Sequence, residues 1–300
     1  MRVTGIGGGH GLAASLRAAR LYADEVSAVV TVADDGGSSG RLTRELGIPP
    51  PGDIRNCLVA LSDGSRLTDL YQHRFGEGTL TGHSVGNLVI AGLTEMLGDF
   101  AAAVDEAGQL IGAHGKVHPA TIELVDLRAM VKGGEVRGQV AVAQSKAPIQ
   151  AVYLEPRAPA AHPPAVDAIL QADQVVLGPG SLFTSLIATL LVPGIRTALR
   201  DTSALRVFVC NARMQKGETD GMDAAAHVES LVAHTGHGCV DVAVVQSPEL
   251  ASDGVPFDRS GWESLPVEVV EADLATPSGT HEPRRLAHVL EALARRRGGD

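Results

Sequence analysis

The sequence predicts an α/β fold, a Rossmann-like and doubly wound sheet that is mostly parallel and carries a β-rich hairpin insertion. Three observations lead to this prediction. The chain opens with a strand–helix–strand pattern, glycine-rich turns follow buried strands at three places, and aromatic residues make up only 3% of the chain, so Val, Leu, Ile and Ala build the core. Such a core suits parallel strands covered by helices. No internal repeat or long linker interrupts the 300 residues, which predicts one domain over 1–300 with the insertion at about 116–155.

The start of the chain is predicted to be a βαβ unit. Residues 3–6 and 26–33 are apolar runs of strand length, and Leu12, Leu16 and Arg20 between them recur at helical spacing. A crossover of this kind joins parallel strands with a right-handed turn. The large sheet is therefore expected to begin with these two strands.

The next segment is predicted to be helical. "GIPPPGD", residues 47–53, is expected to be extended because consecutive prolines fix the backbone, with Asp53 as the N-cap of the helix that follows. A second helix is expected around residues 65–75. "GHSVGNLVIAGLTEMLG" then predicts a long, apolar, buried helix entered through residues 82–86.

From about residue 116 to 154 the hydrophobic period changes to two. Two alternating runs flank Gly133 and Gly134, which is the pattern of a β-hairpin. This segment is the expected antiparallel insertion.

The remaining third returns to the α/β pattern. "AVDAILQADQVVLGPGSLFTSLIATLLV" predicts helix, strand, glycine turn and helix, and "ALRVFVCNA" and "CVDVAVVQ" predict two more strands around a helix at 224–234. "RRLAHVLEALARRR" predicts a closing helix, whose arginines 295–297 suit a solvated C-terminal end.

Composition and charge exclude several classes of function. The formal net charge is −10 and aromatic residues are few, which argues against nucleic-acid partners. Cys57, Cys210 and Cys239 are scattered and form no zinc motif, so free thiols are expected. The chain enters its first strand directly and contains no apolar run near ~18 residues, so we expect a cytoplasmic protein without a membrane span.

The three glycine turns are the strongest functional signal. They lie at residues 7–11, at 36–40, and at 178–180 before Ser181. In a doubly wound sheet, ligands bind at the carboxyl ends of strands, where helix N-termini present N–H groups to anions. The turns therefore favour a phosphate-bearing ligand, although glycines are also common in plain connections.

The second turn follows a pair of acids, Asp34 and Asp35, for which several roles are open. If the strand continues, Asp34 and Asp35 point in opposite directions, so that one enters the cleft and the other caps the turn. A carboxylate there could hold Mg²⁺ or accept from sugar hydroxyls. The dinucleotide motif GxGxxG fails, because His10 or Leu12 occupies its sixth place, but a ribose contact from either acid keeps NAD as a possible ligand.

Other polar residues have weaker signals. Arg41 and Arg55 could bind phosphate or form surface ion pairs. "GHSVG" matches the nucleophile elbow GxSxG, but no strand precedes it, so Ser84 is not expected to be a nucleophile. His83 and Asn87 are expected to face the cleft. No P-loop motif occurs.

Seven stretches in order from residue 5 to about 227 resemble the YvcK-like, or gluconeogenesis factor, family. They are "GGGHG", "TVADDGGSSGRL", "IPPPGDIRNCL", "YQHRF", "LTGHSVGNL", "LGPGSLFTSL" and "NARMQKGETDG". The family is related to the 2-phospho-L-lactate transferase of coenzyme F420 assembly. The resemblance implies a single CofD-like domain in a cytoplasmic bacterial regulator of cell shape, cell-wall precursor supply and growth on gluconeogenic carbon sources, which binds UDP-sugars such as UDP-N-acetylglucosamine.

The resemblance also implies a set of ligand-binding residues. Carried over by motif, they are Gly8, Gly9, His10, Gly11, Asp34, Asp35, Ser38, Arg55, Asn56, His83, Asn87, Gly180, Ser181 and Asn211. Many relatives have Thr in place of His10 and Arg in place of Thr280. If that arginine binds the nucleotide in relatives, Arg284 or Arg285 would have to take its role in this chain.

The relationship to the transferase supports a second hypothesis for the function, that the protein is an enzyme. In it, the protein transfers a phosphoryl-linked group, with Mg²⁺ held by Asp34 or Asp35, which are then also the catalytic candidates. NAD binding is a third hypothesis. A homo-oligomer and a protein partner in cell-wall regulation are further expectations.

Overall fold

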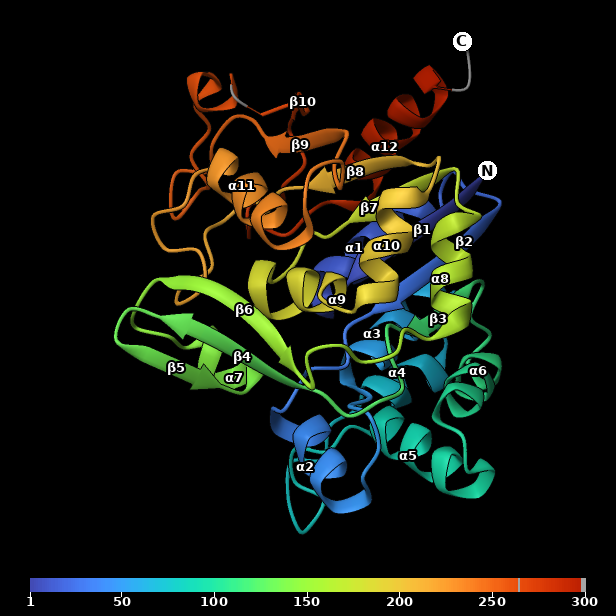
Figure 1. Ribbon diagram of the computed structural model, residues 1–300. Helices are drawn as coiled ribbons and strands as arrows, with labels where there is room; N and C mark the ends of the chain where they lie inside the picture. Colours follow the sequence, from blue (N-terminus) through green and yellow to red (C-terminus); the bar gives the residue numbers. More distant parts are fainter. Residues whose placement is uncertain (264, 298–300) are drawn as a thin grey trace.

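The computed structural model describes residues 1–263 and 265–297. Its centre is a seven-stranded sheet with the order β10-β9-β8-β7-β1-β2-β3, in which every neighbouring pair is parallel (Figure 1). The chain builds outward from β1 in both directions, so β1 and β7 flank the topological switch point. The strands are β1 (Arg2–Gly7), β2 (Glu25–Val30), β3 (Lys116–Pro119), β7 (Gln174–Leu177), β8 (Leu205–Val209), β9 (Val242–Gln246) and β10 (Glu268–Ala272).

Helices cover both faces of this sheet, and a separate hydrophobic core lies on each. Alternation along β7 shows the division, because Val175 and Leu177 pack into one core and Val176 into the other. The first core lies under α8 (Pro163–Leu170), the π-helix η1 (Leu182–Ile187), α9 (Ala188–Leu190), α10 (Pro193–Asp201), α11 (Ala224–Thr235) and the 3₁₀ helix η2 (Arg259–Trp262). The second lies under α1 (Gly9–Ala19), α3 (Gly52–Leu61), α6 (Phe100–Leu110) and α12 (Pro283–Arg297). The predicted doubly wound α/β fold is confirmed.

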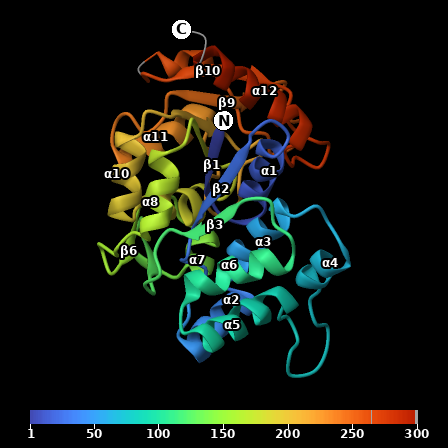
Figure 2. The ribbon, with the colours of Figure 1, turned by 90° about the vertical axis from the view of Figure 1, so that its right-hand side faces the viewer.

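The chain between β2 and β3 forms a helical group at one end of the molecule (Figure 2). Besides α3 and α6, it contains α2 (Gly37–Leu46), α4 (Arg66–Gln72) and α5 (Val85–Leu97). The prediction that α5 is buried is only half right. Ile90 and Ala91 are buried, but Met96 is 80% exposed, because α5 packs on α6 along one face and presents an apolar outer face.

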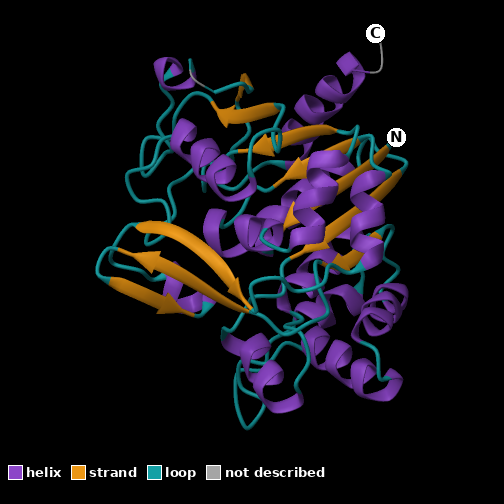
Figure 3. Ribbon diagram, viewed as in Figure 1, coloured by secondary structure: helices purple, strands orange, loops and turns teal. Residues whose placement is uncertain are grey.

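The insertion is a three-stranded antiparallel sheet with the order β5-β4-β6 (Figure 3). It contains β4 (Asp126–Val131), β5 (Gly134–Arg137), the short helix α7 (Gln139–Ala143) and β6 (Ile149–Glu155). The hairpin prediction is confirmed by the pairing of β4 with β5. Residues 116–119, however, form β3 parallel to β2, so the insertion begins later than its predicted start. Leu127, Val152 and Leu154 join the first core, which makes the small sheet part of the same packed unit.

Two other boundaries differ from the sequence prediction. β2 ends at Val30; the Thr31 amide still donates to the Gly7 carbonyl of β1 at 2.9 Å, and residues 31–35 belong to no strand. Asp53 is the second residue of α3, whose N-cap is Pro51, so its carboxyl is available for a tertiary contact.

Within the described ranges, no single helix is long and apolar enough to cross a membrane. Leu182–Leu190 and Pro193–Asp201 meet the length and composition only as a pair, bent by 78°.

Candidate functional site

The first glycine turn joins β1 to the N-terminus of α1. Gly8 is the N-cap with an extended backbone, and the Gly9 amide donates to the carboxylate of Asp53. The next two amides, of His10 and Gly11, have no acceptor in the described part of the chain. The positive end of the α1 dipole is therefore only partly neutralised, which is the arrangement that binds anions.

This turn needs glycine because its backbone lies against other groups. A Cβ on Gly8 would lie 2.4 Å from Asp53 Oδ2, and one on Gly11 would lie 2.4 Å from the Pro179 carbonyl oxygen. Gly9 has a φ of +62°. The first and third turns therefore touch through their backbones, at a spacing that side chains would prevent.

The third turn is held by Asn211. Its amide brackets Gly180, accepting from the backbone N–H at 2.9 Å and donating to the carbonyl at 2.7 Å. Ser15 Oγ donates to the Gly178 carbonyl at 2.7 Å, which ties the turn to α1. Asn211 thus supports the third glycine turn, which is predicted to contact a phosphate.

The helix after the third turn, η1, has a carboxylate that accepts from more of its N-terminal amides than Asp53 does at α1. Glu218 Oε2 accepts from the amides of Phe183 and Thr184 at 3.1 and 3.2 Å, and Oε1 accepts from Thr184 Oγ1 at 2.7 Å. Gln215 Oε1 accepts from the Leu182 amide at 3.3 Å. Glu218 is buried, which raises its pKa. The N-terminus of η1 is therefore closed to an external anion.

A cavity of about 310 Å³, here called the main cavity, opens at these turns. Seven of the residues carried over from the family resemblance line it: Gly8, Gly9, His10, Gly11, Asp34, Gly180 and Ser181. Six lining residues were missed: Thr31, Asp53, Gln139, Thr184, Ser185 and Gln215. Of these, Asp53 carried a sequence signal, its acid next to "PPPG", but it was assigned to a helix cap.

The acids of the main cavity are Asp34 and Asp53. Asp34 Oδ1 accepts from the Gly36 amide at 2.9 Å, so this residue both caps the turn and faces the cavity. Burial raises the pKa of Asp34. Burial, together with the charge of Asp34, raises the pKa of Asp53 to about 7. The pair is thus poorly compensated and would be stabilised by a cation or by hydroxyl donors.

Asp35 has a different role. It is exposed, and its Oδ1 accepts from the Val140 amide of α7 at 2.9 Å. It lines a separate cavity of about 470 Å³ between α2 and the base of the insertion, which Asp34 also lines. The acid pair therefore does split in direction, but Asp35 faces the insertion and not the main cavity.

Five further residues of the family set do not line the main cavity and form two separate hydrogen-bonded groups. Ser38 Oγ lies 2.9 Å from His83 Nδ1 and accepts from Asn87 Nδ2 at 3.1 Å. Arg55 Nη2 donates to Asn56 Oδ1 at 2.6 Å.

Arg55 is 4% exposed, and burial lowers its pKa to about 10. Its Nε and Nη1 have no partner among the described residues. The charges of Asp53 and Asp34 favour its charged form, so Arg55 acts as a buried countercharge behind the cavity acids.

The other sequence candidates have structural roles. Ser84 is the N-cap of α5 and is fully buried, its Oγ accepting from the Asn87 amide. Arg41 donates to the Thr81 carbonyl at 2.6 Å.

A second cavity of about 220 Å³, the adjoining cavity, shares His10, Gly11, Gly180 and Gln215 with the main one. Arg213, Thr280 and His281 line its other side. Arg213 donates to the Pro277 carbonyl at 3.2 Å, whereas Arg285 pairs with Asp273 at 2.6 Å. The arginine placed near Thr280 is therefore Arg213.

The main cavity offers a metal ion two carboxylates, those of Asp34 and Asp53. No group of three His, Cys, Asp or Glu side chains that could hold an ion occurs among the residues that the structure describes. Mg²⁺ commonly takes only one or two carboxylates and completes its shell with water and phosphate oxygens. Asp34 and Asp53 fit that requirement, provided that the ligand brings phosphate.

Comparisons with known proteins agree with this architecture. The family model described as 2-phospho-L-lactate transferase CofD matches residues 3–275. The putative gluconeogenesis factor of Mycobacterium tuberculosis (strain ATCC 25618 / H37Rv) is 45% identical over 98% of this chain and 90% of its own length. The gluconeogenesis factor of Bacillus subtilis (strain 168) is 40% identical over 96% of both.

A solved structure shows the same fold. The crystal structure of a UPF0052 family member from Bacillus halodurans superposes with a TM-score of 0.93 at 38% identity, covering 96% of this chain and 98% of that one. Sequence and fold thus agree over nearly the whole length. The chain belongs to the gluconeogenesis factor family, within the wider CofD family.

Proposed function

We propose that this protein binds a nucleotide sugar, a UDP-sugar such as UDP-N-acetylglucosamine, and acts as a cytoplasmic regulator of cell shape, cell-wall precursor supply and growth on gluconeogenic carbon sources. One observation carries the binding proposal. The N-terminus of α1 is open where the main and adjoining cavities meet, while that of η1 is closed by Glu218. An anionic group flanked by two larger groups fits that junction.

The two cavities suggest how such a ligand lies. The diphosphate would accept from the amides of His10 and Gly11 at the junction. The nucleoside would occupy the adjoining cavity beside Arg213, and the sugar would occupy the main cavity near Asp34 and Asp53. Carboxyl groups there can accept from sugar hydroxyls, and protonation of Asp53 limits their repulsion of phosphate.

The test is thermal stabilisation with a panel of ligands: UDP, UDP-glucose, UDP-N-acetylglucosamine, a GDP-linked donor and NAD, each with and without Mg²⁺. We expect the UDP-sugars to raise the melting temperature, by an amount that increases with the logarithm of the ratio of ligand concentration to dissociation constant. Stabilisation by NAD alone would favour the dinucleotide hypothesis. A flat response to every UDP compound would refute the proposal.

A second candidate is the transfer of a phosphoryl-linked group, which the match to the CofD transferase family and the Asp34–Asp53 pair support. The acceptor hydroxyl oxygen would form a bond to phosphorus, the bond to the leaving nucleoside monophosphate would break, and the hydroxyl proton would pass to a cavity carboxylate. Mg²⁺ held by Asp34 and Asp53 would neutralise the diphosphate.

This candidate predicts consumption of a diphosphate-linked donor, followed by ³¹P NMR with alcohol acceptors and Mg²⁺. Asp53→Asn should abolish conversion. Binding without consumption of any donor would leave the regulator hypothesis alone.

A further inference from the structure

The insertion contributes one residue to the lining of the main cavity, Gln139 at the start of α7. The other lining residues come from the turns and helices at the carboxyl ends of the large sheet, or from the loop after β8. Gln139 does not line the adjoining cavity that holds Arg213. It is therefore placed beside only one end of any ligand that spans both cavities.

The position of Gln139 is fixed by its backbone neighbours. Gly138, with a φ of +95°, turns the chain from β5 into α7, and its amide donates to the Leu127 carbonyl at 2.8 Å. Asp35 approaches so closely that a Cβ on Gly138 would lie 2.1 Å from Asp35 Oδ2. The same carboxylate accepts from the Val140 amide, which anchors the first turn of α7 to the end of the second glycine turn.

The side chain of Gln139 is half-buried, and its amide has no hydrogen-bond partner among the described residues. A primary amide supplies one acceptor and two donors without charge. It can therefore bind a hydroxyl or an acetamido group equally well. Its two N–H groups can also donate to phosphate oxygens, so it is the position of Gln139, in the lining of the main cavity and away from the adjoining one, that favours a contact with the sugar.

We propose that Gln139 is a specificity-determining residue that hydrogen-bonds the sugar of the bound nucleotide sugar, and that Asp35 is a positioning residue that holds it there through α7. This inference rests on the proposed function. It separates two tasks in space: the glycine turns of the large sheet recognise the diphosphate, and the insertion recognises the group attached to it. It also accounts for the second acid of the pair, which faces away from the main cavity.

The experiment measures dissociation constants of the full chain by calorimetry for UDP, UDP-glucose and UDP-N-acetylglucosamine. Gln139→Ala should weaken the binding of one or both sugars about 3- to 10-fold, the range expected for a neutral hydrogen bond, and leave UDP unchanged. If only UDP-N-acetylglucosamine loses affinity, Gln139 contacts the acetamido group. If both UDP-sugars lose affinity equally, it contacts a hydroxyl that they share.

Two further variants control for structural effects. Gln144→Ala removes the same side chain from an exposed position at the C-cap of α7, and should leave all three affinities unchanged. Asp35→Ala should reduce sugar affinity in the same direction as Gln139→Ala, without a change for UDP.

The possible failures are distinguishable. Wild-type protein that binds none of the three compounds refutes the proposed function and the inference with it. Wild-type protein that binds UDP-sugars, with a Gln139→Ala variant whose ratio of sugar to UDP affinity is unchanged, refutes the inference alone. Equal weakening of UDP and UDP-sugars in that variant refutes it as well, because the side chain would then act on the diphosphate.

Discussion

The turns after β1 and β7 look alike in the sequence, yet only one leaves a helix N-terminus open. Both are glycine-rich, both follow a buried central strand and both meet a carboxylate. At α1, Asp53 takes the Gly9 amide and stays in the cavity. At η1, Glu218 binds two amides and a hydroxyl and is buried. The difference teaches that the acid opposite a glycine turn decides whether the turn can bind an anion.

The largest change in stability is expected from substitution of Asp53, the acid at the open turn of α1. The pKa of Asp53 rises from 3.8 in the unfolded chain to about 7 in the folded one. The unfolded chain therefore releases the proton first, so the folded state loses stability as the pH rises from about 4 to about 7. Asn cannot ionise, so the Asp53→Asn variant does not lose this stability. Its free energy of unfolding should therefore rise relative to that of the wild type over the same window, by a value on the order of 4 kcal/mol. Urea unfolding at pH 4.5 and pH 8 measures the gain.

The control is Asp167→Asn, an exposed position on α8, which should leave the pH dependence unchanged. If the unfolding free energies of Asp53→Asn and wild type differ by the same amount at both pH values, ionisation of Asp53 does not destabilise the folded protein.

The next largest change in stability is expected from substitution of Glu218, the acid at the closed turn of η1. Glu218→Ala leaves the amides of Phe183 and Thr184 and the Thr184 hydroxyl buried without an acceptor, and should cost about 3 kcal/mol of unfolding free energy. Glu218→Gln keeps one acceptor oxygen and should lose less. Glu229→Ala on α11, where the side chain is exposed, is the matched control and should change stability little. Equal losses for Ala at 218 and 229 would contradict the capping role.

Much of this comparison could be predicted from the sequence, and its decisive part could not. Strand periodicity predicted the sheet and the hairpin, and the glycine turns predicted a ligand site at the ends of the strands, because these depend on local pattern. The seven cavity residues were carried over from the family resemblance, and five of them lie on those turns: Gly8, Gly9, His10, Gly11 and Gly180. The closure of η1 could not be predicted, because Glu218 lies 34 residues from Thr184 in a segment with no regular period. The placement of Ser38, His83 and Asn87 outside the lining of the main cavity could not be predicted for a similar reason, because it follows from the packing of α2 on α5, where the three side chains hydrogen-bond one another.

A smaller effect is expected where the two turns touch. Gly11→Ala places a Cβ 2.4 Å from the Pro179 carbonyl and 2.6 Å from Gly180 Cα, both rigid backbone atoms. It should cost about 2 kcal/mol and weaken UDP-sugar binding at least ~10-fold, because the turns must separate. Gly92→Ala, in α5 with open space around it, should instead stabilise by up to ~1 kcal/mol. Thermal unfolding and calorimetry measure both; unchanged affinity in Gly11→Ala would separate the turn contact from binding.

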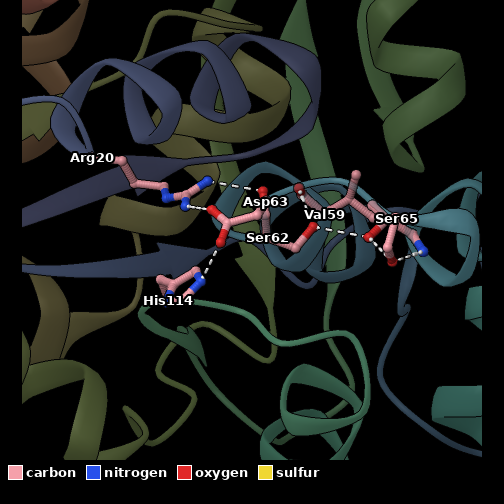
Figure 4. A network of polar contacts seen from close by, with 7 residues as sticks. Arg20, Val59, Ser62, Asp63, Ser65 and His114 are labelled. Carbon is pink, nitrogen blue, oxygen red and sulfur yellow. Dashed lines mark hydrogen bonds and ion pairs between the residues drawn. The ribbon is translucent and has the colours of Figure 1, made fainter.

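The smallest effect is expected at the opposite end of α1. Arg20, its C-cap, pairs with Asp63, and Asp63 Oδ2 lies 2.7 Å from His114 Nε2 (Figure 4). Hydrogen bonds from Arg20 and then His114 lower the pKa of Asp63, so this contribution is present above the ordinary pKa of an aspartate and is lost as the pH falls through the lowered value. Because the group is exposed, Asp63→Asn should lower the melting temperature only slightly at pH 7 and not at all at low pH. It should leave UDP-sugar affinity unchanged, since it perturbs α1 without touching its N-terminus. A loss of affinity equal to that of Gly11→Ala would show that binding depends on the placement of the whole helix and not on the open turn.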